Sequence, residues 1–482
     1  MAGAELVDSA SGSLESDPLL RRHAQAAPPI TPLPKLQLAA IYAIKLTLPI
    51  SHTQMMPYLN VLIAQLAASE GAETGYYSGI VGSAGGVAHL LTIYLWARIS
   101  DRVGRIPVII VGTIGIAVST ILFGLSHSFA TVLIARFLVG VFSATTGAIH
   151  SVVGELTDAT NQSIAFPYYD IVAALGFVIG PLIGGTFANP AENFPSLFNT
   201  PFWRAYPYLL PCLVTAAGTL AALLLAIFVL EETLHSKRAL TKQSDTTPSF
   251  ADAGSLRDDA PAPSAPLSIA HLLALPAVRA VCLASGALGF AGGGFNSGFV
   301  LLAYTPVAQH GLGLSVVRIG YALSAMGAVS IALKLCMPIL LRRAGTSNLF
   351  AFCMQVWPVT FASMSVLSVI AQRVEAAGGQ ALEWVAVGTV LFLSRVGCLA
   401  FSIIMILTKD HTPGTSSLGS ANGLAEFFQS AAGALGPTII SSLFAVSVSK
   451  NLLGGYLWVV LMVLFSFIGV WLAKRIKQYR DD

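Results

Sequence analysis

Charged residues are scarce in this chain. Only 10% of its 482 residues are Asp, Glu, Lys or Arg, whereas 55% are hydrophobic, and the mean hydropathy is +0.74. An ordinary globular domain carries roughly a quarter charged residues. The composition therefore excludes a soluble globular protein and indicates a polytopic membrane protein. The formal net charge is only +3, so nothing indicates a nucleic-acid partner.

Motifs of pumps and of metal-dependent enzymes are also absent. The dipeptide Gly-Lys does not occur, so the chain lacks the GxxxxGK[ST] loop that cradles nucleotide phosphates. No two of the 9 histidines lie three or four residues apart, and the 5 cysteines form no CxxC pair. We therefore expect no metal site, no cofactor and no enzymatic activity. If the protein moves a solute, a gradient must supply the energy.

Long apolar runs are abundant instead. A helix needs about 20 mostly apolar residues to cross a bilayer. Such segments lie near 38–65, 75–98, 107–126, 129–152, 163–188, 206–230, 279–305, 316–341, 348–371, 382–407, 419–446 and 452–473. The sequence thus predicts an all-α integral membrane protein with twelve transmembrane helices in two six-helix bundles.

Polar segments divide the chain into five parts. We expect a disordered tail over 1–35, an N-terminal bundle over 36–230, a linker over 231–275, a C-terminal bundle over 276–475 and a short tail over 476–482. Most of the 26 Lys and Arg lie in the tails, the linker and the loops on their side of the membrane. The positive-inside rule then places both termini and the linker in the cytoplasm.

The N-terminal tail is polar, and we expect no signal peptide before the first span. Its segment "ESDPLLRR" (15–22) fits an acidic-dileucine sorting address, which would direct the protein to an endosomal or vacuolar membrane. A chance match in a disordered tail leaves the plasma membrane as the alternative.

The two halves of the chain resemble each other. "SDRVGRIPV" (100–108) follows the second span and "LRRAGTSNL" (341–349) follows the eighth. "GPLIGGTFA" (180–188) in the fifth span has a counterpart in "GPTIISSLFA" (436–445) in the eleventh. Two six-helix units in the same orientation are a transporter architecture, which predicts a path between the halves.

Two motifs carry glycines at special positions. In "ALGFVIGPLIGG" (174–185), Gly176, Gly180 and Gly184 share one helical face that lets another helix approach closely, and Pro181 and Gly185 complete the motif. In "SDRVGR" (100–105), Asp101 and the basic Arg102 and Arg105 lie where the second span meets water, and Gly104 allows a tight turn. Anchoring by the positive-inside rule explains the arginines but neither the acid nor the glycine.

Several ionisable residues fall inside the predicted spans. A charge at mid-bilayer costs about 2.5–3.5 kcal/mol, so such residues should face a cavity or each other. The candidates for a substrate or proton pathway are Lys45, His52, His89, Arg136, Asp170, Lys334, Arg395 and Glu426. The alternatives are a snorkelling Lys45, a neutral hydrogen-bonded His89, helix-end stabilisation by Glu426, and pairing of Lys334 and Arg395 with backbone carbonyls.

These motifs resemble those of the major facilitator superfamily, in its twelve-span drug:proton antiporter branch. "GFVIGPLIGG" is similar to the antiporter signature, "WARISDRVGRIP" (96–107) to the loop signature and "RFLVG" (136–140) to the span-four arginine motif. "GELTDATNQSIAF" (154–166), "GLGLSVVRIG" (311–320) and "NGLAEF" (422–427) resemble the fungal and plant zinc-induced-facilitator-like carriers. At Leu48 this chain lacks an acid that relatives often carry in the first span.

The resemblance implies a secondary active transporter that works by alternating access. It implies proton-coupled export of a small organic molecule, such as a drug or secondary metabolite, by a monomer in the lipid bilayer. Asp101, Arg102, Gly104 and Arg105 would then form a cytoplasmic latch that joins the halves in one state. The alternatives are uptake of an organic solute or metal chelate by proton symport, or a non-transporting sensor on the same fold.

Overall fold

The computed structural model describes residues 31–70, 74–158, 161–233, 269–377, 380–412 and 418–481. The sorting motif at 15–22 and most of the predicted linker lie outside these ranges. The described N-terminal half contains α2 (Lys35–Thr53), α3 (Met56–Glu70), α4 (Thr74–Val103), α5 (Arg105–Gly124), α6 (Phe129–Ser143), α7 (Thr146–Leu156), α8 (Gln162–Phe187), the short α9 (Pro190–Asn193), α10 (Pro195–Phe198) and α11 (Pro201–Ala205), and α12 (Leu209–Val229).

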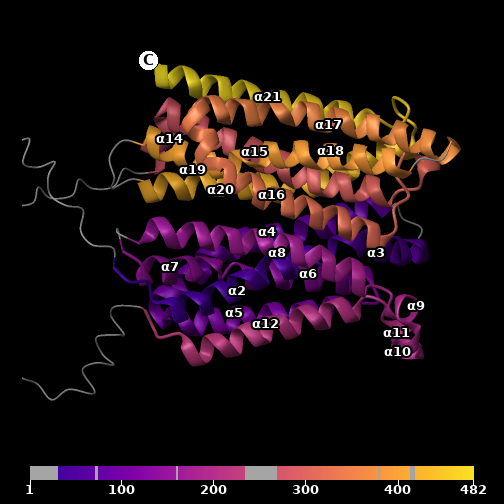
Figure 1. Cartoon of the computed structure of the whole chain (residues 1–482), viewed down its shortest axis with the longest axis horizontal. Helices are drawn as coiled ribbons and strands as arrows, with labels where there is room; N and C mark the ends of the chain where they lie inside the picture. The colour runs from indigo at the N-terminus through magenta and orange to yellow at the C-terminus, as the bar shows by residue number, and fades with distance from the viewer. Residues whose placement is uncertain are drawn as a thin grey trace, which may run out of the picture.

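The C-terminal half repeats this order of long antiparallel helices. It contains α14 (Ile269–Ala274), α15 (Pro276–Tyr304), the 3-10 helix η1 (Val307–Gln309), α16 (Val316–Ala344), α17 (Thr346–Ala377), α18 (Gln380–Cys398), α19 (Ala400–His411), α20 (Leu418–Ser449) and α21 (Leu457–Asp481). Figure 1 shows the two halves side by side, the N-terminal half in indigo and magenta and the C-terminal half in orange and yellow.

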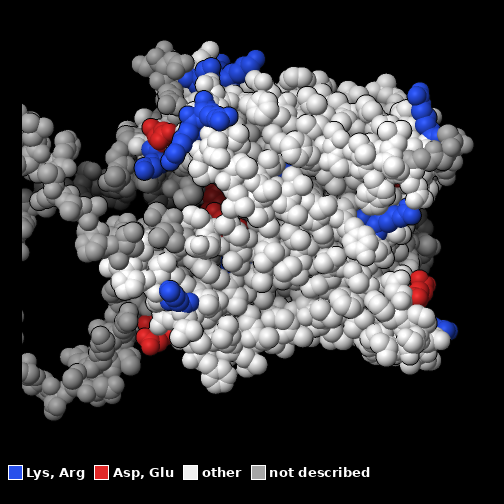
Figure 2. Space-filling view, viewed as in Figure 1, with Lys and Arg blue, Asp and Glu red and all other residues white. Residues whose placement is uncertain are grey.

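The predicted all-helical membrane architecture is confirmed. Eleven segments within the described ranges are long and apolar enough to cross a membrane. The predicted span at 38–65 corresponds to α2 and α3, which are separated at Gln54 and Met55. Large apolar side chains point outward, such as Phe228, which is 84% exposed. Figure 2 shows Lys and Arg mainly near the two ends of the molecule, with a largely uncharged belt between them.

The two ends of the molecule differ. The chain terminus, the start of α2, the end of α12 and the start of α14 all lie at one end, which we call the terminal face (left in Figure 1). The short helices α9 to α11 lie at the opposite end, which we call the loop face. The long helices run between these faces in alternating directions, as expected of a protein that crosses a membrane repeatedly.

Each half has its own buried core of aromatic and aliphatic side chains. In the C-terminal half the rings of Phe295 and Trp357 lie 6.1 Å apart and those of Phe295 and Phe361 lie 6.4 Å apart. In the N-terminal half Tyr58 stacks on Tyr208 with ring centroids 4.8 Å apart. Separate cores allow each half to behave as a rigid unit.

The halves meet through small residues. Gly75, Gly79, Gly82 and Gly86 lie on one face of α4, and a Cβ atom at any of them would lie 2.8–3.0 Å from a side chain of α20. Thr438 of α20 adds hydrogen bonds, because its Oγ1 donates to the Gly79 carbonyl oxygen at 3.0 Å and lies within hydrogen-bond distance of Ser83 Oγ, at 2.7 Å. Such contacts need glycine, since any side chain would separate the backbones.

A second contact between the halves joins α8 to α16. A Cβ atom at Gly185 would lie 3.0 Å from the Gly320 Cα atom. Ser324 Oγ of α16 donates to the Val178 carbonyl oxygen of α8 at 2.9 Å. Gly185 is near the end of α8 and Gly320 near the start of α16, so this contact lies toward the loop face.

The four-spaced glycines of α8 pack within the N-terminal half. Added Cβ atoms at Gly176, Gly180 and Gly184 would overlap Pro49, Thr53 and the Gln54 carbonyl oxygen, respectively. These partners belong to the last turn of α2 and to the break before α3. The glycines therefore provide the space in which the first span changes direction.

Replacing Gly184 with alanine should destabilise the protein, because the new methyl group would overlap the Gln54 backbone. Overpacking of this kind typically costs about 1–3 kcal/mol, so we expect a lower midpoint of thermal unfolding in detergent. Gly218→Ala in α12 is the matched control, because a Cβ atom there would meet nothing within 4 Å. A midpoint for Gly184→Ala equal to that of the control would contradict the close contact.

Candidate functional site

A cavity with two lobes lies between the halves. Lobe A has a volume of about 340 Å³ and lobe B of about 310 Å³, and both are lined by residues of the N-terminal and the C-terminal half. Met56, Gly293 and Asn296 line both lobes and mark where they adjoin. These volumes lie in the range of about 300–1,000 Å³ that is usual for small-molecule sites.

Lobe A combines charged and apolar side chains. Asp170 of α8, Lys334 of α16 and Arg395 of α18 line it together with Phe177 and Phe401. Three separate helices thus bring together residues that are far apart in sequence. Arg395 Nη2 donates to Asn296 Oδ1 at 3.5 Å, and its Nε donates to Ser394 Oγ at 3.2 Å.

Lobe B is basic. His52 of α2 and Arg136 of α6 line it, together with the polar Asn60 and Ser78, whose side chains hydrogen-bond to each other. Arg136 is only 2% exposed, and within the described ranges its Nε has no hydrogen-bond partner. A buried guanidinium with an unsatisfied donor is unusual and indicates a functional site.

Glycines position Arg136. A Cβ atom at Gly85 of α4 would lie 3.2 Å from Arg136 Nη2, and one at Gly140 of α6 would overlap the Gly85 carbonyl oxygen. Helices α4 and α6 therefore approach so closely that the guanidinium lies against bare backbone. A larger residue at Gly85 would have to displace the arginine.

Lys45 lies beside the cavity, with its ammonium 4.3 Å from the centre of the Tyr169 ring. The charges of Asp170, Glu426 and Lys334 are within electrostatic range of this ammonium. Asp170 and Glu426 are both exposed although each lies two turns inside a helix, α8 and α20. Figure 2 shows acidic side chains in a recess between the halves toward the terminal face. The cavity is therefore accessible from the terminal face, whereas packing closes it toward the loop face.

The structure thus separates the predicted pathway residues into four groups. Asp170, Lys334 and Arg395 line lobe A, and His52 and Arg136 line lobe B. Lys45 and Glu426 line neither lobe, but their charges interact with each other. His89 lines neither lobe, and its Nδ1 lies 3.2 Å from Ser143 Oγ.

Sequence reasoning missed the uncharged polar residues of the cavity. Asn60 and Asn296 line it, and Asn296 is shared by both lobes. An uncharged amide inside an apolar span carries a weak signal, because it is less costly to bury than a charge. The sequence nevertheless places Asn60 and Asn296 within predicted spans, and polar residues in spans tend to face the bundle interior.

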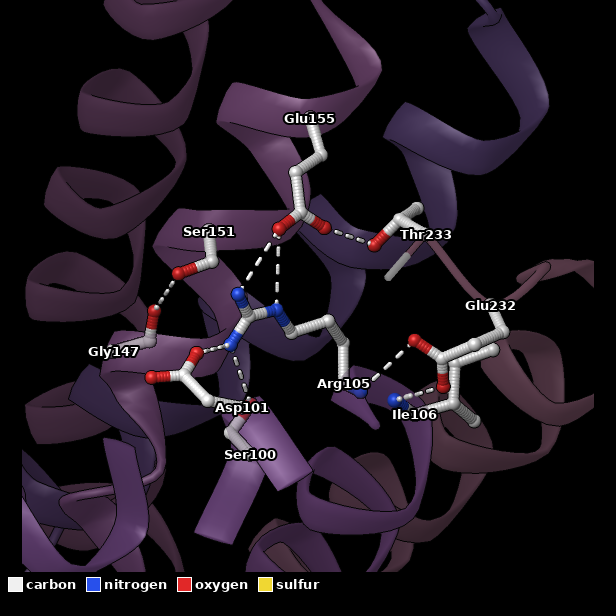
Figure 3. Close-up of polar contacts among 9 residues, drawn as sticks. All are labelled: Ser100, Asp101, Arg105, Ile106, Gly147, Ser151, Glu155, Glu232 and Thr233. Carbon is white, nitrogen blue, oxygen red and sulfur yellow. Dashed lines mark hydrogen bonds and ion pairs between the residues drawn. The ribbon is translucent and has the colours of Figure 1, made fainter. Parts of the chain in front are cut away.

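The loop motif after α4 forms a network at the terminal face (Figure 3). Arg105 Nη1 donates to Asp101 Oδ1 at 2.6 Å and to Ser100 Oγ at 3.1 Å, and its Nε and Nη2 donate to Glu155 Oε1 at 3.2 and 3.1 Å. Thr233 donates to the other Glu155 oxygen. All these residues belong to the N-terminal half, and Arg102 is exposed.

Glu232 holds the start of α5. Its carboxylate accepts from the backbone N–H of Arg105 at 2.9 Å and of Ile106 at 3.2 Å, and so stabilises the positive end of the helix dipole. Gly104 adopts φ = 118°, and a Cβ atom there would lie 2.6 Å from Glu232 Oε2. Only glycine fits this turn, because it adopts a positive φ readily and has no Cβ atom that would clash with Glu232.

Two similar six-helix halves around a central cavity define a class of membrane transporters. The chain belongs to the Major Facilitator Superfamily, whose profile matches residues 39–437. It is 36% identical to the major facilitator-type transporter psiT2 of Psilocybe cyanescens, over 93% of this chain and 91% of that protein. The efflux pump azaK of Aspergillus niger is 26% identical, over 89% of this chain and 86% of that protein.

Other relatives agree with the resemblance drawn from the motifs. The Arabidopsis thaliana protein ZINC INDUCED FACILITATOR 1 is 31% identical over 46% of each chain. A solved structure of a bacterial homolog of the human lysosomal transporter Spinster, inward-facing and unoccupied, has a TM-score of 0.65 at 15% identity and covers 94% of this chain and 98% of that one. The family resemblance is confirmed, and the protein is a transporter rather than an enzyme.

Removing Glu155 should destabilise the network at the terminal face more than removing Asp101. The Glu155 side chain is 21% exposed and that of Asp101 is 65% exposed, while their shared partner Arg105 is 11% exposed. A bond from a charged group in a sheltered place contributes about 1.5–3 kcal/mol, whereas an exposed ion pair contributes about 0–1 kcal/mol. We expect Glu155→Gln to lower the midpoint of thermal unfolding clearly and Asp101→Asn to leave it nearly unchanged. Equal shifts would contradict this ranking.

Proposed function

We propose that this protein exports a small organic molecule from the cytoplasm in exchange for protons, by alternating access. The observation that carries the proposal is the asymmetry of the cavity, which is packed shut toward the loop face and accessible from the terminal face. A carrier must expose one binding site to the two sides of the membrane in turn. The efflux pump azaK and a multidrug transporter, mfsB of Aspergillus fumigatus, are similar to this chain and support export.

The terminal face is the cytoplasmic side in this proposal. The positive-inside rule supports that orientation, since most Lys and Arg outside the spans belong to the tails, the linker and the loops of that side. Both termini are then cytoplasmic, and the state described above faces the cytoplasm. The transporter acts as a monomer in the plasma membrane or in a vacuolar or endosomal membrane.

Asp170 is the proposed proton carrier. It is an exposed carboxylate in lobe A, and its charge is within range of Lys45. With Leu48 at the position where relatives often carry an acid, Asp170 is the one carboxylate among the residues that line either lobe. Proton binding would neutralise it and release Lys45 from its influence, which links the proton to the electrostatics of the substrate site.

The outward-facing state requires the cytoplasmic ends of the halves to close. Asp101 is the proposed latch for that state, with Arg102, Gly104 and Arg105. The Asp101 side chain is 65% exposed, so it can exchange its bond to Arg105 for a contact with the other half when the recess closes. In the state described above its partner belongs to its own half, as expected of an open latch.

Asp170→Asn should abolish accumulation driven by a proton gradient but preserve exchange. An asparagine cannot bind and release a proton, yet it keeps the size of the side chain. The measurement is flux into sealed proteoliposomes under an imposed pH gradient, with a panel of amphiphilic and acidic compounds. Glu192→Gln is the matched control, because Glu192 lies in the short helix α9 at the loop face, away from both lobes. Gradient-driven accumulation by Asp170→Asn at the wild-type rate would refute this assignment. Accumulation by the wild type without any proton gradient would refute antiport itself.

Asp101→Asn should shift the protein toward the cytoplasm-facing state. The loss of a charge-assisted contact, worth about 1.5–3 kcal/mol, changes the ratio of the two states by about tenfold or more. The shift is measured as faster labelling of single cysteines introduced at Gly423, which is exposed, and at Ser430, which lines lobe B, both in α20, together with slower transport. Cys336 is exposed and Cys398 lines lobe A, so both are first replaced by serine. Unchanged labelling and unchanged flux would show that Asp101 is only a surface charge.

A further inference from the structure

The charges that line the cavity do not cancel. Arg136, Lys334 and Arg395 are basic, whereas Asp170 is the only acidic residue among those that line the two lobes. In a cleft with low-dielectric walls, such an excess of one sign attracts the opposite charge.

Four charged residues near the cavity balance one another in sign. Lys45 and Lys334 are positive, Asp170 and Glu426 are negative, and the last three are within electrostatic range of Lys45. Together they contribute no net charge. The uncompensated positive charge of the cavity therefore belongs to the two arginines, Arg136 and Arg395.

Neither arginine has a carboxylate partner within the ranges that the structure describes. The ion pairs that form within those ranges join Arg105 to Asp101 and to Glu155. Arg395 contacts Asn296 at 3.5 Å and Ser394 of its own helix at 3.2 Å. Arg136 is 2% exposed and its Nε is unsatisfied. The part of the chain that the structure describes thus holds two guanidinium groups in its interior without a carboxylate paired to either of them.

The two arginines occupy comparable places in the two halves. Arg136 lies in α6 of the fourth span and Arg395 in α18 of the tenth, and each helix is interrupted shortly afterwards, at Ala144 and Leu399. Each half thus contributes one arginine to the cavity, Arg136 to lobe B and Arg395 to lobe A. A ligand bound between the halves can contact both halves through its charge.

We propose that the transported substrate is a small organic anion with an aromatic or similarly apolar body. This inference rests on the proposed transport function and names its substrate class. The acidic group binds to Arg395 in lobe A, and Arg136 extends the positive surface into lobe B. The apolar body packs against Phe177, Met326 and Phe401, which line lobe A. Arginine suits this role because its planar fork matches carboxylate and phosphate oxygens.

The same arrangement disfavours organic cations. A cation that enters lobe A meets Lys334 and Arg395, and one that enters lobe B meets Arg136. Asp170 offers one compensating charge, but Lys45 already acts on it. Placing like charges together in a desolvated site lowers affinity, so the cavity discriminates by repulsion as well as by attraction.

The test is a binding series on one ring system. We would titrate the purified full-length protein in detergent with 2-naphthoate, 2-naphthamide and 2-naphthylmethylammonium, and measure Kd by calorimetry at pH 7. These probes share the naphthalene body and differ in charge. We expect 2-naphthoate to bind at least tenfold more tightly than the neutral amide, and the ammonium to bind most weakly. An ammonium that binds as tightly as 2-naphthoate, or no measurable binding of 2-naphthoate, would overturn the proposal.

Substitutions of the two arginines test where the acidic group of 2-naphthoate binds. Arg395→Gln should raise the Kd of 2-naphthoate at least tenfold with little change for 2-naphthamide, and Arg395→Lys should restore part of the affinity. The control is Arg279→Gln, which removes a positive charge from the exposed surface of α15 outside both lobes. Wild-type affinity for 2-naphthoate in both Arg395→Gln and Arg136→Gln would overturn the site. If Arg395→Gln fails to fold, Arg395→Lys and Arg136→Gln still decide the question.

A phosphate ester of the same ring system tests which acidic group the site prefers. Tighter binding of 2-naphthyl phosphate than of 2-naphthoate would assign a phosphate ester, and the reverse a carboxylate. Binding is measured without a gradient, so the result is independent of proton coupling. Selective binding of the anion without flux in proteoliposomes would refute transport but support the binding site. Proton-driven flux of the ammonium alone would refute the anion but support transport.

Discussion

Close contact between helix backbones is the constraint on which this structure depends. In lipid there is no hydrophobic force to drive helices together, so association relies on packing. Glycines on α4 bring it against α20, and glycines on α8 bring it against α2 and α16. These contacts close the cavity toward the loop face and also shape its walls. Because glycine contacts are tight but lack interlocking side chains, the two halves can separate and repack as rigid units.

The same packing solves the problem of charge inside a membrane. An isolated charge in hydrocarbon is expensive, yet Arg136, Lys334 and Arg395 all lie within spans. Each of them lines the central cavity instead of facing lipid. Gly85 and Gly140 make room for Arg136 between α4 and α6. The charged interior is therefore compatible with the membrane only because two separate bundles enclose a space between them.

The network at the terminal face connects this interior to the surface. Glu232, which lies just after α12, caps α5, and Arg105 at the start of α5 bonds to Asp101 and Glu155. The ends of α4, α5, α7 and α12 are thus tied into one unit. A rigid end lets the N-terminal half move as a body, and Asp101 is an exposed member of this network.

The sequence by itself determined the membrane class, the helical spans, the two-fold repeat and the family, because each depends on local composition or on short motifs. It also identified Asp170, Arg136 and Arg395, since a charge within an apolar span stands out wherever it falls. Only the tertiary structure decided which charges meet. Arg136 and Arg395 are more than 250 residues apart in sequence, and Asn296, shared by both lobes, carries only a weak signal. Helix rotation and packing decide whether a residue faces lipid, a neighbouring helix or the cavity. That choice depends on glycine contacts between distant segments, such as Gly184 with Gln54, which no local pattern specifies.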